Sequence, residues 1–586
     1  MKFIPSFGEF SIKGKAAFKR LPIVITWAIV GTIFTLVQIE SETMDENIAT
    51  NTIITFSLGV SWLIAARFFI EQFHKDKTWI LVFPFLLIGV FYVSLPTTEN
   101  LDNTHWTRFL LYLLGGHLAV FVAPFVLKWQ KKAYFNYLKS IFIAIVRSAF
   151  FSLILYLGII LALAAFENLF NFDIDSKRYF QIFIICLGIV NTWIYLSDFP
   201  KNIYQQTTLN YTKALEVFVK YILIPLVILY LVILYAYGFK ILINWNLPKG
   251  WVSYLVIALS FLGFIIQICV NPIQKTIDSR VIKRFYPWFY RLLLPLIVLL
   301  FVAIFRRILE YGVTEKRYFV LVLSLWILAM TFYMLFSKKK QIRTFPLTLG
   351  ILSLVISVGF WSAFSVSTKS QVKQFSKIYL QMKEKSFKVS SDEKKQFNSI
   401  LRYLGKKKQL KNITPVLGYN PTTAFNVDSY WEIQRKIADS LQIKVIKSDN
   451  DIESILGKSN YFYLQNENNF TINIKGYDFF KQLYINKSIK NNSIQNYYFY
   501  LDTGKNIINI KKGNVFYQID LKEFIVNMIG SSENQAIYHD RMTLIKEFET
   551  LRVKLIFQNI SFNRLSENQT YQKIQNARVY VLIKEK

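Results

Sequence analysis

The sequence has 586 residues, of which 53% are hydrophobic, and its 69 Lys and Arg residues outnumber 37 Asp and Glu residues. A basic balance of this size raises the question of nucleic-acid binding. In the first two thirds of the chain, however, the basic clusters separate long apolar runs, where lipid headgroups and membrane topology account for them. We therefore expect membrane lipids, and no nucleic acid, among the partners.

Cysteine and histidine are both scarce. Cys186 and Cys269 lie inside apolar runs, and the four histidines share no local ligand spacing. A disulfide framework needs paired cysteines, and a histidine metal site needs clustered ligands. We expect no disulfide framework, no metal and no cofactor.

The first residues, 1–20, form a basic segment that we expect to be cytoplasmic. Lys13, Lys15, Lys19 and Arg20 precede the apolar stretch LPIVITWAIVGTIFTLVQI, as a secretory signal would begin. The stretch shows no small-x-small cleavage site, so we interpret it as a retained first membrane span.

Apolar runs long enough to approach the ~20 residues of a membrane span recur through residues 21–366, which predicts about eleven transmembrane helices. The candidates are 21–39, 53–70, 79–95, 109–127, 148–166, 179–196, 217–239, 251–270, 292–309, 318–336 and 345–366. The number of spans depends most on the region of 148–166, because the preceding residues 133–147 (AYFNYLKSIFIAIVR) could form a separate interfacial helix.

The orientation follows from the positions of Lys and Arg, which favour cytoplasmic loops. Alternate loops, beginning with the N-terminus, carry most of the basic residues, whereas the first intervening loop (ESETMDENIATN) is purely acidic. This pattern predicts a cytoplasmic N-terminus. With an odd number of spans, residues 367–586 would then lie outside the cytoplasm, and a miscount by one span would move them inside.

The tail, residues 367–586, is polar and rich in Lys and Asn. Helical patterns cover 371–385, 393–409 and 428–442, the last behind Asp428 as a possible N-cap. Strand-like alternation begins at 459. The expected strands are YFYLQ, FTINI, YYFYLD, NIINI, NVFYQID, a stretch near 550–560, and ARVYVLIKE. We predict a soluble α+β domain.

Polar residues concentrate at the end of the ninth expected span and in the turn after it. The apolar stretch between Arg291 and Arg306 is too short to cross a ~30 Å hydrocarbon layer, so a charge is expected at its edge. Intramembrane charges are costly and favour a functional role. The predicted functional polar cluster consists of Arg306, Arg307, Glu310, Tyr311, Thr314, Glu315 and Arg317.

The same cluster also has a structural interpretation, which we weigh more heavily. In the functional interpretation the partner of the arginines is Glu310, which stands at i+4 from Arg306 and i+3 from Arg307, within pairing distance on a helix. The structural interpretation rests on the turn that follows. Gly312 could take a left-handed position that ends one helix. Thr314 could cap the next, with Glu315 in its first turn. The arginines would then extend to lipid headgroups.

His117 is the second candidate polar group within a span. It follows Gly115 and Gly116 in the stretch 109–127. A proton-handling role is one interpretation. The favoured one is a neutral, hydrogen-bonded histidine at a place where small residues allow close helix contact.

The stretches YILIPLVILYLVILYAYGFKILINWNLPKGWVSYLVIALSFLGF and WFYRLLLPLIVLLFVAIFRRILEYGVTEKRYFVLVLSLWIL, with the element RI-x-x-YG-x-TE-x-RY, resemble a bacterial membrane family catalogued as domain of unknown function 4153. The resemblance covers most of residues 20–370 and implies a protein of the bacterial cytoplasmic membrane. It transfers no catalytic residues.

Together these features predict a polytopic α-helical membrane protein with a C-terminal extracytoplasmic α+β domain. Three functions remain open. The leading hypothesis is a binding or assembly module whose tail, 367–586, contacts an envelope component or a protein partner. The alternatives are a transporter of a small or anionic solute and a membrane-embedded transferase acting on lipid-linked substrates.

Overall fold

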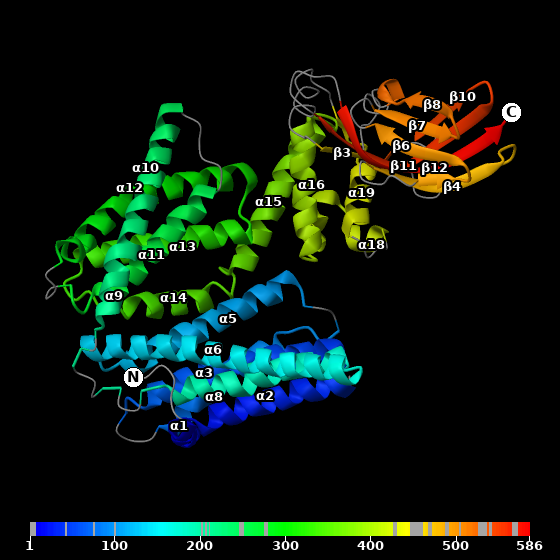
Figure 1. The fold of residues 1–586 in the computed structure, drawn as a ribbon. Coiled ribbons are helices and arrows are strands. Elements are labelled where there is room, and N and C mark those ends of the chain that lie inside the picture. Colours follow the sequence, from blue (N-terminus) through cyan, green and yellow to red (C-terminus); the bar gives the residue numbers. More distant parts are fainter. Residues whose placement is uncertain are drawn as a thin grey trace. The chain divides into compact units, whose positions relative to one another are not determined.

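The structure is a computed structural model, and its chain divides into two compact units (Figure 1). Unit 1 comprises Met1–Phe387 and Asp392–Ile443, and unit 2 comprises Lys388–Ser391 and Lys444–Lys586. The described residues are 7–41, 44–73, 77–98, 101–200, 203–204, 208–209, 211–244, 251–274, 279–425, 430–445, 461–466, 471–486, 492–502, 506–524, 536–537, 542–564 and 572–586.

Unit 1 is helical. Its helices up to the tail are α1 (Phe7–Arg20), α2 (Pro22–Ser41), α3 (Glu46–Ile70), η1 (Thr78–Leu81), α4 (Val82–Val93), α5 (Asn103–Val122), η2 (Ala123–Phe125), α6 (Lys131–Phe170), α7 (Ser176–Ile185), η3 (Cys186–Asn191), α8 (Thr192–Ser197), α9 (Lys213–Phe218), η4 (Val219–Leu223), α10 (Ile224–Asn244), α11 (Trp251–Val270), α12 (Arg280–Tyr311), α13 (Glu315–Phe336) and α14 (Thr344–Val355). The segments η3 and η4 are π-helical insertions within longer helices.

Within the described part of the chain, nine helices are long and apolar enough to cross a membrane. They coincide with nine of the eleven expected spans. The other two expected spans, 79–95 and 345–366, form the shorter apolar helices Thr78–Val93 and Thr344–Val355. The second is short because the chain turns at 356–362 before the next helix begins.

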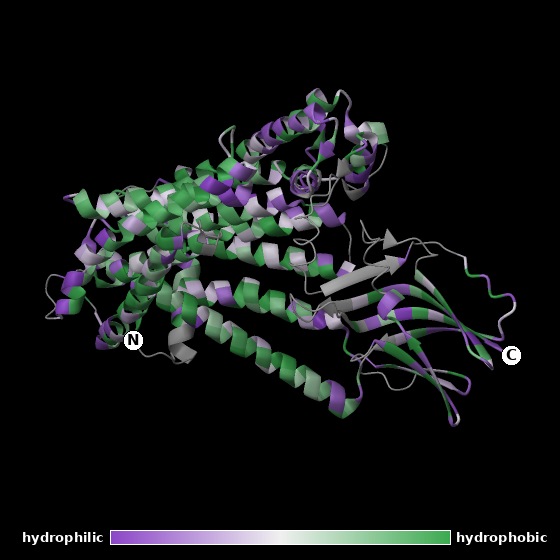
Figure 2. Ribbon diagram, turned by 90° about the horizontal axis from the view of Figure 1, so that it is seen from above, coloured by the Kyte–Doolittle hydropathy of each residue, from purple (hydrophilic) through white to green (hydrophobic). Residues whose placement is uncertain are grey.

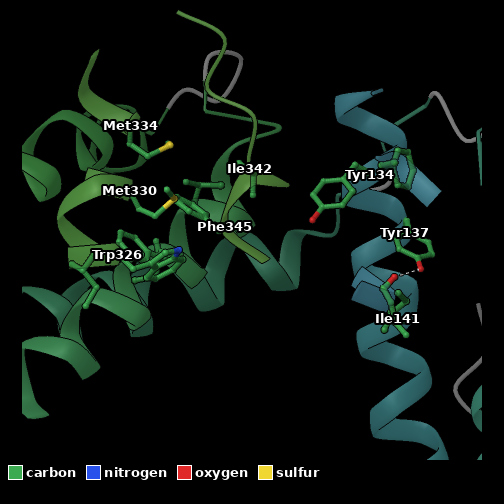
Figure 3. Packing of buried hydrophobic residues seen from close by; sticks show 14 of the residues in the cluster. Tyr134, Tyr137, Ile141, Trp326, Met330, Met334, Ile342 and Phe345 are labelled. Atoms are coloured by element: carbon green, nitrogen blue, oxygen red, sulfur yellow. Dashed lines mark hydrogen bonds between the residues drawn. The ribbon is translucent and has the colours of Figure 1, made fainter. Parts of the chain in front are cut away.

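Helix α6 is one continuous helix of 40 residues. The alternative of a separate interfacial helix over 133–147 is therefore not observed. The first part of α6 is kept in the helical core by Tyr137, whose hydroxyl donates to the Val120 carbonyl at 2.7 Å, as Figure 3 shows. The same view shows Trp326, Met330 and Phe345 of the shared hydrophobic core.

Small residues allow α5 to approach its neighbours closely. A Cβ added at Gly116 would lie 2.3 Å from Ser61 Oγ of α3, and one at Gly115 would lie 3.0 Å from Ser353 Oγ of α14. Side chains at these two positions would push the helices apart, so the glycines set the spacing of α3, α5 and α14.

Unit 1 also exposes many apolar side chains. In the most apolar window of α6 only 6% of the residues are buried, and α10 exposes Ile228, Val232 and Ile243. Hydrophobic residues accordingly colour long stretches of the helices of unit 1 in Figure 2. A surface of this kind suits a hydrocarbon solvent better than water.

The helical beginning of the tail belongs to unit 1. It contains α15 (Ala363–Glu384), α16 (Ser391–Lys406), η5 (Leu410–Ile413), α17 (Thr414–Leu417), α18 (Pro421–Phe425) and α19 (Tyr430–Ser440). The helices expected at 371–385, 393–409 and 428–442 are thus present, although Asp428 lies outside the described residues. The compact unit continues to Ile443, well past the domain boundary expected at 367.

Unit 2 is β-rich. Its strands are β1 (Lys388–Val389), β2 (Lys444–Val445), β3 (Tyr461–Asn466), β4 (Phe479–Asn486), β5 (Asn492–Ile494), β6 (Tyr497–Asp502), β7 (Ile507–Lys512), β8 (Val515–Asp520), β9 (Ala536–Ile537), β10 (Thr543–Glu547), β11 (Leu551–Arg564) and β12 (Gln572–Glu585). One sheet has the order β4-β12-β11-β3-β9, with β10 beside β11, and another has the order β5-β6-β7-β8.

The two larger sheets share one core. Tyr497 and Phe499 of β6 and Ile510 of β7 pack in the same buried cluster as Val553 and Val581 of β11 and β12. Most of the expected strands are confirmed, but 471–474 of the FTINI segment is irregular, and the strand β4 was not expected. The sequence FFKQLYIN of β4 lacks strict alternation, because its outer face carries the exposed aromatics Phe480 and Tyr484.

Candidate functional site at the α12–α13 turn

The predicted polar cluster forms the turn between α12 and α13. Gly312 ends α12 with φ +71° and ψ −178°, and its N–H donates to the Ile308 carbonyl at 2.9 Å. A positive φ was expected here, but the ψ is extended rather than left-handed helical. This region of backbone space is open almost only to glycine. A Cβ at this position would also lie 2.9 Å from Gln371 Nε2.

Thr314 occupies the N-cap position of α13, but its side chain makes no capping hydrogen bond. The prediction that the Thr314 hydroxyl caps α13 is therefore wrong. The backbone carbonyl of Thr314 does accept the first hydrogen bond of the helix, from the Tyr318 N–H at 2.8 Å. Glu315 lies in the first turn of α13, as expected, where the helix dipole favours a carboxylate.

Side chains from two tail helices bind the backbone of this turn. Gln371 Nε2 donates to the carbonyls of Tyr311 and Val313, each at 3.0 Å, and Ser370 Oγ accepts from the Val313 N–H at 2.8 Å. The Glu310 carbonyl accepts from Gln396 of α16 at 3.0 Å. The last carbonyls of a helix have no hydrogen-bond donor within the helix. The side-chain amides of Gln371 and Gln396 therefore supply hydrogen bonds that α12 cannot make by itself.

An ion pair joins the same region to α16. Lys407 Nζ, just after the end of α16, lies 3.1 Å from Glu315 Oε1, and both side chains are 14% exposed. The ammonium also donates to Thr104 Oγ1 of α5 at 3.1 Å. Burial and the neighbouring Glu315 carboxylate raise the pKa of Tyr403, which comes from α16. Three helices thus meet around one half-buried charge pair.

An aromatic ring completes this meeting point. The Phe364 ring of α15 has the Arg108 guanidinium of α5 at 5.4 Å and the Lys407 ammonium at 6.0 Å. Cations at such distances are attracted to the ring face. We name Thr104, Arg108, Glu315, Phe364, Tyr403 and Lys407, together with the turn 310–314, the helix joint.

Two residues of the predicted cluster, Arg306 and Arg307, lie outside the helix joint, and Glu310 belongs to it through its backbone carbonyl. The side chains of Arg306 and Glu310 are exposed and Arg307 is half-buried. Among the ion pairs of the described chain, none joins Glu310 to either arginine. Arg317 instead donates to the Gly312 carbonyl of the joint at 2.7 Å and lies 5.3 Å from the Tyr311 ring. The structure therefore brings Tyr311, Thr314 and Glu315 into the joint, places Arg317 against it, and leaves the side chains of Arg306, Arg307 and Glu310 outside it.

His117 lies at the exposed surface of α5, away from Gly115 and Gly116. Its Nδ1 is 2.8 Å from the Leu113 carbonyl of the same helix. The favoured interpretation expected a hydrogen-bonded ring at a close helix contact. The ring is hydrogen-bonded, but Gly115 and Gly116 make the close helix contacts on another face of α5.

The acidic loop after the first span is bound locally. Glu40 Oε2 lies 2.7 Å from Arg178 Nη1 of α7, and Asp45 accepts from the Asn47 N–H as the N-cap of α3. Glu42 lies outside the described residues. No group of three potential metal ligands occurs in the described part of the chain.

A second polar cluster, not predicted from the sequence, contains an ion pair that is almost fully buried. Arg147 Nη1 of α6 donates to both carboxylate oxygens of Asp198 at 2.9 Å, with side chains 3% and 6% exposed. Lys13 Nζ of α1 lies 3.6 Å from the same carboxylate. The available signal was an arginine in the apolar run SIFIAIVRSAFF, which calls for a buried partner.

A further pair lies nearby in the same unit. Arg20 binds Glu71 through two hydrogen bonds, at 2.8 and 2.7 Å, and donates to the Pro200 carbonyl at 2.9 Å. The fork of a guanidinium matches a carboxylate in this way. These contacts tie α1 to the end of α3 and to the segment after α8.

The fold and the helix joint define a class: a many-helix protein with apolar-surfaced helices, continued by a β-rich unit. Residues 52–384 match the family model described as Domain of unknown function (DUF4153), so the chain belongs to that family. This match confirms the resemblance.

One curated relative is the uncharacterised protein PM1469 of Pasteurella multocida (strain Pm70). It is 26% identical over 369 residues, which make up 61% of this chain and 59% of the relative. The match thus spans less than two thirds of the relative's own length. No solved structure matches the chain.

Proposed function

We propose that the chain is a multi-pass protein of the bacterial cytoplasmic membrane that presents its tail as a binding or assembly module. The nine long apolar helices and the exposed apolar surfaces of α6 and α10 support membrane insertion. The alternating basic loops support a cytoplasmic N-terminus and residues 367–586 outside the cytoplasm.

The helix joint is the observation that carries the binding role. Its polar groups contact backbone carbonyls, an ammonium and an aromatic ring of the protein itself: Gln371 binds the turn, and Glu315 binds Lys407. Such contacts hold α15 and α16 firmly on the ends of α5, α12 and α13. A tail whose first helices are anchored in this way suits a protein that presents its later residues to a partner.

An exposed aromatic face of unit 2 supports the same role. On β6, β7 and β8 the residues Tyr498, Lys511 and Phe516 stand directly opposite one another, and Tyr500 follows on the same face of β6. Tyr498 is 50% exposed and Phe516 is 58% exposed. Aromatic side chains are enriched where proteins bind partners, so this face is suited to contact an envelope component or protein.

A topology experiment tests the orientation. Fusions of alkaline phosphatase, which is active outside the cytoplasm, and of green fluorescent protein, which fluoresces in it, would be placed after residue 370 and within residues 1–6. We expect phosphatase activity at the first site and fluorescence at the second. Fluorescence without phosphatase activity at residue 370 would place the tail in the cytoplasm and refute the proposed orientation.

A cross-linking experiment tests the binding role. A photoreactive amino acid replaces Tyr498 or Tyr500 in cells, and replaces Lys481, exposed on the other sheet, as the control. We expect a discrete cross-linked product at Tyr498 and Tyr500 but not at Lys481. Equal, diffuse labelling at all three positions would contradict a specific binding face.

The two alternatives receive no specific support from the geometry. The transporter hypothesis needs polar groups along a path, whereas His117 lies at the surface of α5 and Asn191 donates to Ser152 Oγ at 3.0 Å between α6 and η3. The transferase hypothesis needs the acidic loop free for a metal or substrate, whereas Glu40 binds Arg178.

A further inference from the structure

An apolar groove of about 530 Å³ lies among α3, η1, α4, α5 and α14. Its walls include Trp62, Ala66 and Phe69 of α3, Phe83 of α4, Ala119 of α5 and Leu347 of α14. The volume falls within the range of small-molecule sites. Along α3 the groove extends from Trp62 to Phe69, a rise of about 10 Å at 1.5 Å per residue, and Phe73, just after the helix, continues it.

The groove exists because two of its walls are short helices. The helical segment Thr78–Val93 and the helix Thr344–Val355 do not reach the length of the nine long apolar helices beside them. Short helices packed against long ones cannot fill the full depth of the bundle. At ~30 Å of hydrocarbon, the unfilled space would meet acyl chains rather than water.

The two ends of the groove differ in charge. Lys77 lies at one end, with its ammonium 4.3 Å from the centroid of the Phe73 ring, and among the described residues that line the groove it is the only charged one. Arg343 reaches the same end, where its guanidinium donates to the Val126 carbonyl at 2.9 Å. The opposite end, near Trp62, is apolar. A ligand with an anion at one end and a hydrocarbon tail matches this gradient.

The surface around the opening is apolar as well. Trp79 is 71% exposed, Phe83 is 65% exposed and Leu86 is 61% exposed. A water-soluble metabolite would have to pass this surface to enter, whereas a lipid would arrive along it. Tryptophan beside lysine is also the combination found where a membrane helix meets headgroups.

We propose that this groove binds one acyl chain of an anionic glycerophospholipid, with Lys77 facing the headgroup phosphate. The proposal rests on the membrane insertion proposed above. It does not depend on the side on which the tail lies or on a partner of the tail, because the groove lies among α3, η1, α4, α5 and α14 and Lys77 is the residue before η1.

Native mass spectrometry of the full chain in a neutral detergent tests the proposal. Phosphatidylglycerol and phosphatidylcholine of identical acyl chains would be added separately. We expect the protein to retain phosphatidylglycerol about tenfold more than phosphatidylcholine, which corresponds to ~1.4 kcal/mol. Lys77→Gln should reduce the first to the level of the second. Ala119→Phe, which fills the groove, should reduce both.

Two matched variants serve as controls. Lys339→Gln removes an exposed lysine between α13 and α14, and Ala162→Phe adds the same bulk to the exposed face of α6. Both should retain lipid like the parent protein. Equal retention of the two lipids by the parent, or unchanged retention in Lys77→Gln or Ala119→Phe, would overturn the proposal.

A second measurement covers the case in which a variant fails to fold. The unaltered protein would be irradiated with phosphatidylglycerol carrying a diazirine on one acyl chain, and the labelled peptides mapped. We expect labelling within 62–73, 79–84 and 119–126. Labelling confined to other helices, such as α6 or α10, would show that bound lipid lies elsewhere and would refute the groove as its site.

Discussion

Two ion pairs, one from each unit, lie in opposite environments. In unit 1 the Arg147–Asp198 pair is almost fully buried, while apolar side chains of α6 and α10 are exposed. In unit 2 the Lys512–Glu585 pair is at the surface, with side chains 39% and 45% exposed, while the apolar side chains fill the space between the sheets.

This difference means that breaking the ion pair should change the free energy of unfolding more in unit 1 than in unit 2. When a buried charge loses its partner, no water can take the partner's place. Breaking the pair therefore lowers the free energy of unfolding strongly. An exposed pair competes with water and contributes little. The contrast accords with the membrane insertion proposed above for the apolar helices of unit 1.

The largest effect is expected for Asp198→Asn. The change leaves the buried Arg147 without its counter-charge and also removes the partner of Lys13. We expect a loss of about 3–5 kcal/mol in the free energy of unfolding, measured by denaturation in detergent. In the control Arg147→Met/Asp198→Asn no arginine charge is left buried at this site, and much of the loss should be recovered. Unaltered stability of Asp198→Asn would contradict the contrast between the units.

An intermediate effect is expected for Gly312→Ala in the helix joint. The substitution strains the backbone at φ +71° and brings a Cβ to within 2.9 Å of Gln371 Nε2. We expect a loss of about 1–3 kcal/mol in the same measurement. Gly418→Ala is the comparison at another positive φ, because Gly418 has φ +83° with a left-handed helical ψ of −5° and no atom within 4 Å of an added Cβ. A loss no larger than that of Gly418→Ala would show that the contact with Gln371 does not matter.

The smallest effect is expected for Glu585→Gln in unit 2. Hydrogen bonds from Lys512 and Tyr497 lower the pKa of Glu585 below 4.5, and the bond to Glu585 raises the pKa of Lys512 above 10.5. The contribution of the carboxylate is present above its ordinary pKa and is lost as the pH falls through the lowered value. The contribution of the ammonium is lost as the pH rises through the raised value.

Unit 2 should therefore keep the contribution of this pair between about pH 4.5 and 10.5. Hydrogen exchange of β12 in the full chain, corrected for the intrinsic rate at each pH, measures it. In Glu585→Gln the acid dependence should become shallower while protection at pH 7 falls only slightly. A loss of protection at pH 7 as large as that caused by Asp198→Asn in unit 1 would remove the distinction.

Local patterns were enough to predict several parts of the fold. The apolar runs located nine long helices, and the alternation in YYFYLD and ARVYVLIKE located β6 and much of β12. Gly312 was recognised as the end of a helix because glycine readily adopts the positive φ that ends many helices, although its ψ of −178° differs from the left-handed value expected. Each of these features depends on residues close together in the chain.

Contacts between distant residues could not be predicted in this way. Glu310 was expected to pair with an arginine one turn away, but the turn is bound by Gln371 and Gln396, which are far along the chain. The partner of Arg147 is Asp198, 51 residues on. Helical spacing defines which pairs of residues near in sequence can interact. Packing decides whether a residue far away in the sequence lies closer in space.

The sequence by itself determined that this chain has many apolar helices, a polar turn at 310–317 and a strand-forming tail, because these follow from periodicity and composition. The tertiary structure decided that the turn serves as a joint to α15 and α16, that Arg147 is neutralised by Asp198, and that two short helices leave a groove beside Lys77. The physical reason is that burial and charge neutralisation depend on which segments meet, and that is settled by the packing of the whole unit.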